Sequence, residues 1–202
     1  MSCPGVGVSP GTIPVYHGTT SMASDRRVRV VELILRCLMC SLAVAAAVLV
    51  GTDSQVREIF GIRKAARFTD MKALVFLVIA NGVAASYSLI QASRSIASMI
   101  RGNVLFSKPL AWAIFSSDQV MAYVMVAAVA ASLQSAVLAK AGQPELQWMK
   151  ICDLYERFCT QVGEGIACAV LVSIGAVASS GISAYGLFRL YGSSKGEARP
   201  SW

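Results

Sequence analysis

The sequence predicts an all-α integral membrane protein that crosses the bilayer with four transmembrane helices packed as one bundle. Of its 202 residues, 55% are hydrophobic and only 14% are charged, whereas soluble domains carry about 25% charged residues. The apolar residues gather in four long runs, and two of these runs each enclose one charge, of opposite sign. The expected spans are residues 30–51, 73–92, 110–139 and 166–190.

Each run is long enough to be a span, because a helix crosses the hydrocarbon layer with about 20 residues at roughly 1.5 Å per residue. We therefore assign residues 30–191 to one membrane domain. Residues 1–29, rich in Gly, Pro, Ser and Thr and without an early apolar stretch, are expected to form a disordered tail rather than a secretory signal. Residues 192–202 form a second tail. The loops are short, which excludes a large catalytic domain outside the membrane.

Charge favours cytosolic termini without deciding the orientation. Four spans place both termini on one side, and the basic cluster of residues 26–29 directly before the first span favours the cytosol for that side. The basic loop 57–72 argues for the reverse. The net charge of +7 comes largely from residues that flank the spans, so it indicates contact with lipid headgroups rather than with nucleic acid.

Arg36 in the first run and Asp118 in the third are the most informative residues. A charge inside the bilayer costs about 2.5 kcal/mol or more, so such residues are usually paired or functional. The first and third spans run in the same direction, and both residues lie roughly 9–12 Å from the same end of their spans. Equal depth in parallel helices is what an ion pair requires.

Three interpretations of these charges remain open. In the first, Arg36 donates a two-nitrogen fork to Asp118, and the ion pair fixes which helices face each other. In the second, Asp118 is a proton or cation site of a small transporter or channel. In the third, Arg36 extends alone towards the headgroups or pairs with Glu32 one turn away. The spans contain no internal proline and the halves show no repeat, which lowers the expectation of a transporter.

Two further patterns concern cross-linking and packing. Cys152 and Cys159 lie in one predicted outer loop, where an oxidising environment permits a disulfide if a turn brings the two residues together. Small residues recur at four-residue spacing in two spans, which lets helix backbones approach closely in lipid and makes lateral self-association a further possibility. These helix-packing residues are Ala80, Ala84 and Ser88 in the second span and Gly175, Ser179 and Ser183 in the fourth.

The sequence predicts no enzyme and no cofactor. The single histidine, His17, lies in the N-terminal tail, which leaves no histidine in the spans for a catalytic triad or a metal site. No phosphate-binding glycine loop is present.

Three segments together resemble the Casparian strip membrane protein-like (CASP-like) family of plants, and its group 2 branch in particular. They are Glu32-Leu-Ile-Leu-Arg36, Ser116-Ser-Asp-Gln-Val-Met-Ala-Tyr123, and Trp148-Met-Lys-Ile-Cys152 followed by Phe158-Cys159. The similarity covers roughly residues 26–192. The family's intramembrane arginine and aspartate fall on Arg36 and Asp118, and its outer-loop cysteines fall on Cys152 and Cys159.

The resemblance implies a multi-pass plasma-membrane protein with both termini in the cytosol. It further implies a non-catalytic scaffold that associates with itself and with relatives and recruits cell-wall-modifying enzymes. Strip-forming members carry an apolar-aromatic signature in the first outer loop. The corresponding loop here, residues 52–67, is basic and lacks it, so the resemblance does not extend to a role in building the strip.

Overall fold

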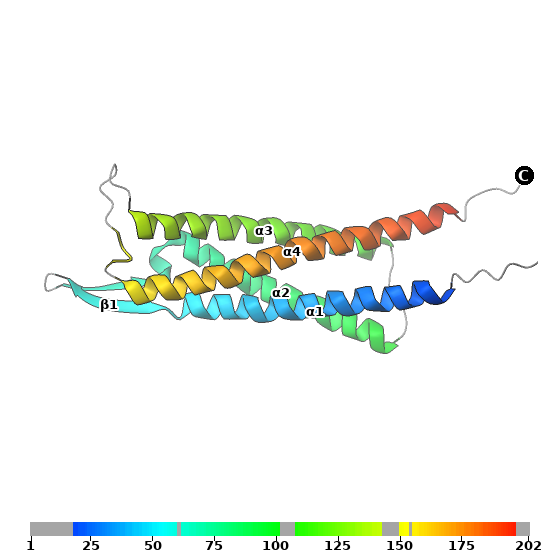
Figure 1. Ribbon diagram of the computed structural model, residues 1–202, viewed down its shortest axis with the longest axis horizontal. Coiled ribbons are helices and arrows are strands. Elements are labelled where there is room, and N and C mark those ends of the chain that lie inside the picture. The colour runs from blue at the N-terminus through cyan, green and yellow to red at the C-terminus, as the bar shows by residue number, and fades with distance from the viewer. Residues whose placement is uncertain (1–17, 60–61, 102–107, 143–149, 154, 197–202) are drawn as a thin grey trace, which may run out of the picture.

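Four long helices lie side by side and form the body of the protein (Figure 1). The computed structural model describes residues 18–59, 62–101, 108–142, 150–153 and 155–196. The helices are α1 (Gly18–Gly51), α2 (Lys72–Arg101), α3 (Lys108–Ala141) and α4 (Glu156–Gly196). Each contains a stretch long and apolar enough to cross a membrane: Arg27–Gly51, Lys72–Ile100, Pro109–Ala141 and Glu156–Phe188. The predicted four-helix membrane fold is confirmed.

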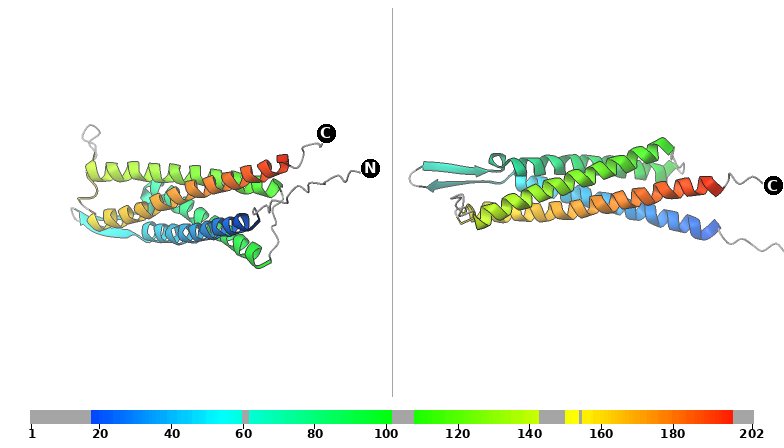
Figure 2. Two further views of the ribbon diagram at one scale, coloured as in Figure 1. Left: turned by 45° about the vertical axis from the view of Figure 1, so that its right-hand side comes forward. Right: turned by 90° about the horizontal axis from the view of Figure 1, so that it is seen from above.

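The two ends of the bundle differ. The start of α1 and the end of α4 lie together at one end, which we call the terminal end (Figure 2). A two-stranded antiparallel hairpin projects from the other, which we call the hairpin end. The hairpin pairs β1 (Ser54–Ile59) with β2 (Ile62–Arg67), and a 3-10 turn, η1 (Phe68–Asp70), leads into α2. We did not predict these strands, because polar and apolar residues alternate too weakly along the six residues of each strand to indicate a strand from sequence.

The helices are longer than the predicted spans. The largest extension at one end is in α1, which begins at Gly18, so residues 18–29, which we assigned to the disordered tail, continue the helix. α2 runs on to Arg101, and α4 begins ten residues before residue 166 and continues to Gly196. Hydropathy marks only the part of a helix that lies in lipid, whereas the helix itself continues until a breaker stops it. The remaining parts of the predicted tails, residues 1–17 and 197–202, lie outside the described residues.

Local chemistry sets the ends of α3 and α1. Pro109 occupies the first turn of α3, where its missing N–H costs nothing. Gly142 follows the last residue with φ of 68°, and its N–H donates to the carbonyl of Leu138 at 2.9 Å, a left-handed helix stop that favours glycine. At the end of α1, the Thr52 hydroxyl donates to the carbonyl of Val48 at 2.6 Å.

Packing around the bundle determines which helices face one another. α1 packs against α2 and α4, and α3 packs against α4 and α2, so α1 and α3 lie diagonally opposite. The buried residues follow a 3-4 spacing typical of left-handed helix packing, and many of them are alanines that bring the backbones close. The core of α1 comprises Met39, Ala43, Ala46 and Val50, and that of α4 includes Ile166, Ala169, Val172 and Ala176.

Two contacts join the helices in pairs near the hairpin end. The Ser132 hydroxyl of α3 lies 3.3 Å from the Ala73 carbonyl at the start of α2. Gly165 of α4 packs on α1 so closely that a Cβ there would lie 2.5 Å from Val50 Cγ2. We call the positions of Val50, Ala73, Ser132 and Gly165 the hairpin-end level, which lies at the end of the apolar run of α1.

Candidate functional site

An ion pair joins the diagonally opposed helices inside the bundle. The Nη2 atom of Arg36 donates to both carboxylate oxygens of Asp118, at 2.8 Å to Oδ1 and 2.7 Å to Oδ2. Both residues are only 1% exposed. The predicted two-nitrogen fork is wrong in detail, because a single nitrogen reaches both oxygens. Arg36 therefore reaches across the diagonal of the bundle to Asp118.

Donors from two other helices complete the shell of Asp118. The Tyr87 hydroxyl of α2 donates to Asp118 Oδ1 at 2.7 Å, and the Ser183 hydroxyl of α4 donates to Oδ2. Gln91, one turn after Tyr87, donates its amide to the tyrosine oxygen at 2.8 Å. We call Arg36, Tyr87, Gln91, Asp118 and Ser183 the polar centre. It links all four helices, and a carboxylate that accepts several charge-assisted hydrogen bonds is held more firmly than by one ion pair alone.

The helix positions explain why these residues meet. Arg36 lies 14 residues from Val50, Tyr87 14 residues from Ala73, and Asp118 14 residues from Ser132. All three therefore lie about 21 Å from the hairpin-end level. A hydrocarbon layer of roughly 30 Å leaves about 9 Å between them and the terminal-end boundary, as expected from the sequence.

Arg36 has weaker neighbours as well. Its Nη2 lies 3.9 Å from Glu32 Oε1, and the Glu32 side chain is 27% exposed, so this contact is long and open to the surroundings. The guanidinium also lies over the Tyr87 ring, 5.5 Å from the centroid, in a cation–π arrangement. Its Nε atom is buried without a hydrogen-bond partner. The structure therefore joins two of the alternatives left open, with Asp118 the near partner and Glu32 the distant one.

A second polar group lies beside the polar centre, between α3 and α4. The Ser180 hydroxyl donates to Gln119 Oε1, and Gln119 Nε2 donates to the Tyr123 hydroxyl at 3.0 Å. Ser180 is 7% exposed, whereas the Tyr123 ring is 66% exposed on the outer face of α3. This group therefore connects the interior of the bundle to its lipid-facing surface.

The small residues singled out in the sequence lie inside the bundle. Ala80, Ala84 and Ser88 of α2 are at most 2% exposed, and Ser179 of α4 is 1% exposed. The Ser179 hydroxyl lies 3.4 Å from Met39 Sδ, and a Cβ on Gly175 would lie 2.8 Å from Met39 Cγ. The contacts of Gly175 and Ser179 bring α4 against α1, and the buried small residues of α2 likewise face the interior, so these residues pack helices within one chain.

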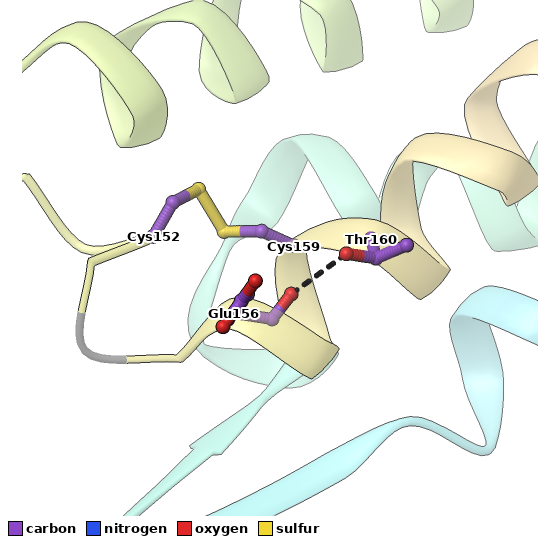
Figure 3. The surroundings of a disulfide bond; sticks show 4 residues. All are labelled: Cys152, Glu156, Cys159 and Thr160. Atoms are coloured by element: carbon purple, nitrogen blue, oxygen red, sulfur yellow. Dashed lines mark hydrogen bonds between the residues drawn. A yellow bond between two sulfur atoms is a disulfide. The ribbon is translucent and has the colours of Figure 1, made fainter.

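The structure brings Cys152 and Cys159 together at the hairpin end. Their Sγ atoms are 1.97 Å apart and their Cα atoms 5.6 Å apart, in a disulfide between the loop before α4 and the first turn of that helix (Figure 3). A turn at residues 151–153 provides the reversal that the pairing requires. The N–H groups of Ile151 and Cys152 both donate to the carbonyl of Ala139 near the end of α3. The loop is therefore tied to α3 by hydrogen bonds and to α4 by the disulfide.

Several residues of the polar arrangement were not predicted from sequence, namely Tyr87, Gln91 and Ser180. Tyr87 and Gln91 lie on the inward face of α2 beside Ser88, so the 3-4 spacing of buried positions could have identified them. Among the described residues, no group of three or more His, Cys, Asp or Glu side chains could hold a metal ion. Trp148 of the resembling segment lies outside the described residues.

Fold and polar centre together define a multi-pass membrane protein whose four spanning helices meet at one intramembrane ion pair. The sequence profile of the Casparian strip membrane protein domain matches residues 25–175, and the chain belongs to the CASP-like family, in its group 2. It is 68% identical to CASP-like protein 2B1 of Ricinus communis and 64% identical to CASP-like protein 2B2 of Populus trichocarpa, in each case over the full length of both chains. It is 62% identical to CASP-like protein 2B2 of Arabidopsis thaliana, again over the full length of both. No solved structure matches the chain.

Proposed function

We propose that this protein is a non-catalytic scaffold of the plasma membrane, with both termini in the cytosol, whose copies associate laterally and organise a membrane domain. Its associates would be further copies of this chain, related family members, membrane lipids and cell-wall-modifying enzymes. The proposal extends to this chain what the resemblance implies for the strip-forming relatives. On this orientation the terminal end is cytosolic, and the hairpin and the disulfide face the cell wall.

The observation that carries the proposal is the closure of the polar centre. The Asp118 carboxylate is 1% exposed and accepts hydrogen bonds from α1, α2 and α4. A transported cation or proton would have to displace Arg36 from this shell, which would leave a buried charge unpaired at a cost of several kcal/mol. A centre of this kind favours a fixed arrangement of helices over a transport site. A fixed bundle presents constant surfaces to its neighbours, as a scaffold requires.

Lateral mobility tests the scaffold directly. Fluorescence recovery after photobleaching of a tagged full-length chain in a plant plasma membrane should be slow and incomplete, in discrete patches. Fast and complete recovery from an even distribution would overturn the proposal. A tagged single-span protein of the same membrane serves as the mobile control.

The transporter alternative makes a separate prediction. If Asp118 carried protons or cations, flux through proteoliposomes that contain the protein would depend on pH and vanish in Asp118→Asn. We expect no flux above that of empty liposomes in either protein. A pH-dependent flux lost in the variant would replace the scaffold by a transporter.

A further inference from the structure

The outer face of α3 carries a tyrosine hydroxyl at the middle of the bilayer. Tyr123 lies nine residues from Ser132, which places it about 13 Å from the hairpin-end level. That is close to half of a hydrocarbon thickness of roughly 30 Å. The side chain is 66% exposed on the outside of the bundle. Neither water nor a lipid headgroup reaches this depth.

The Tyr123 hydroxyl still has a proton to donate. Its oxygen accepts a hydrogen bond from Gln119 Nε2, and no acceptor for its O–H lies among the described residues. Other lipid-facing hydroxyls are satisfied within their own helix: Ser86 donates to the carbonyl of Gly82 at 3.0 Å, and Ser93 to that of Leu89 at 2.8 Å. A tyrosine hydroxyl stands too far from its helix to reach the backbone in this way. An unsatisfied donor in hydrocarbon is costly.

The residues around Tyr123 form a seam suited to a second helix. Exposed positions on α3 recur at alternating spacings of four and three residues, the 3.5-residue period of a left-handed helix pair. These residues, which we call the α3 seam, are Ser116, Val120, Tyr123, Ala127, Ala130 and Gln134. Ala127 and Ala130 are small enough for close approach of another backbone. Figure 1 shows α3 along one edge of the bundle, where its outer face is open.

The equivalent faces of the other helices lack such a group at this depth. Near the middle of the bilayer α1 exposes Val44, α2 exposes Val83 and α4 exposes Ile174. These side chains are apolar and carry no hydrogen-bonding group, so contact with lipid chains leaves no hydrogen bond unmade. Among the described residues at this depth, the α3 seam is therefore the lipid-facing surface that leaves a hydrogen-bond donor, the Tyr123 O–H, without an acceptor when only lipid chains surround it.

We infer that the α3 seam binds the α3 seam of a second copy of this chain, in a parallel dimer in which each Tyr123 hydroxyl donates to Gln119 Oε1 of the partner. The inference rests on the proposed lateral association and names the face that makes it. Two copies with the same topology are related by a two-fold axis along the membrane normal, so a contact of Tyr123 with Gln119 of the partner occurs twice in the dimer. Each copy supplies both groups: Tyr123 in the seam has the free donor, and Gln119 beside the seam has in Oε1, which accepts from Ser180, an oxygen with a second lone pair. A second copy therefore satisfies the hydroxyl without any other partner.

Cysteine cross-linking in native membranes tests the face. In a background with Cys3, Cys37, Cys40 and Cys168 changed to serine, which keeps Cys152 and Cys159, we expect Val120→Cys and Ala127→Cys to give a dimer band on mild oxidation. The controls Val44→Cys, Val83→Cys and Ile174→Cys place the thiol on the other three helices at comparable exposure and should give several-fold less dimer. Equal or greater cross-linking at any control would overturn the inference.

The hydroxyl has its own test. Tyr123→Phe should weaken self-association roughly tenfold, the effect of two hydrogen bonds of the size measured in membranes. The matched control is Tyr185→Phe, because Tyr185 is 64% exposed but lies near the terminal-end boundary, where its hydroxyl reaches water. Stepwise photobleaching of single labelled particles in nanodiscs counts the copies as a function of concentration. Equal association of the two variants would contradict the role of the hydroxyl.

The outcomes also separate this inference from the proposed function. A chain that forms oligomers by photobleaching but shows no preferred cross-link on the α3 seam keeps its lateral association and loses this face. A chain that is monomeric at every concentration would overturn both the α3-seam inference and the proposed lateral association. A dimer that is immobile in cells and cross-linked through the α3 seam supports both.

Discussion

The polar centre and the hairpin end hold the same four helices by opposite means. At the polar centre, an ion pair and its hydrogen bonds act about 21 Å from the hairpin-end level, in a part of the bundle where water is excluded. At the hairpin end, a disulfide and backbone hydrogen bonds act where the helices leave the membrane. In hydrocarbon, removing one partner of an ion pair or hydrogen bond leaves the other without any partner. Outside the membrane, water can take the place of the lost hydrogen bond. The same kind of change should therefore cost more at the polar centre.

The largest effect is expected from removing one charge of the ion pair. Asp118→Ala leaves Arg36 buried with only the distant Glu32 as a counter-charge and should destabilise the protein by about 3–5 kcal/mol. The thermal unfolding temperature of the detergent-solubilised full-length chain measures this loss. The double variant Arg36→Ala with Asp118→Ala should recover part of the loss, because no charge is then stranded. A double variant no more stable than the single one would show that the pairing does not matter.

Removing the disulfide should have a smaller effect. Cys159→Ser should lower the free energy of unfolding by roughly 2–3 kcal/mol, the entropy of closing a short loop in the unfolded chain. Either single substitution removes the whole disulfide. Cys152→Ser and the double variant should therefore lower the free energy of unfolding by the same amount as Cys159→Ser. Reductant should lower the unfolding temperature of the unchanged chain and leave the variants unaffected. A loss larger than that of Asp118→Ala would reverse the ranking of the two regions.

Close packing at the hairpin end offers a third comparison, between two glycines. Gly165→Ala places a Cβ 2.5 Å from Val50 Cγ2, a stiff and fully buried side chain, and overpacking of this kind costs about 1–3 kcal/mol. Gly82→Ala meets nothing within 4 Å and should be neutral or stabilising, since alanine favours helix over glycine by up to about 1 kcal/mol. Unfolding temperatures of the two variants measure the difference. Equal effects would contradict the close contact between α4 and α1.

The smallest expected effect concerns Asp53, just beyond the end of α1. Burial raises the pKa of its carboxyl above the usual value, and Oδ2 has no hydrogen-bond partner. The folded protein therefore holds this proton more tightly than the unfolded chain does. Stability from this group is greatest below the unfolded pKa of about 3.9 and is lost as the pH rises through the raised folded value. Asp53→Asn should increase stability slightly at neutral pH and flatten the pH profile of the unfolding temperature between those two values. A variant less stable than the unchanged chain at neutral pH would contradict this assignment.

Much of this protein could be predicted because lipid imposes simple rules on sequence. The four apolar runs predicted the spans, and the equal depth of Arg36 and Asp118 predicted that they could meet, since helix rise converts sequence position directly into height. Hydropathy could not predict how far the helices continue beyond the membrane, as the start of α1 at Gly18 shows. It also carried no information on the hairpin, whose pairing depends on the register of Ser54–Ile59 against Ile62–Arg67.

By itself, the sequence determined that the chain crosses the membrane four times, where its charges lie in depth, and which family it resembles. Only the tertiary structure decided which faces the helices turn to one another. It placed Tyr87 and Ser183 on Asp118, turned the small residues of α2 and α4 inward, and left Tyr123 facing lipid. The physical reason is that depth follows from counting residues along one helix, whereas rotation about each helix axis is settled by the packing of all four together.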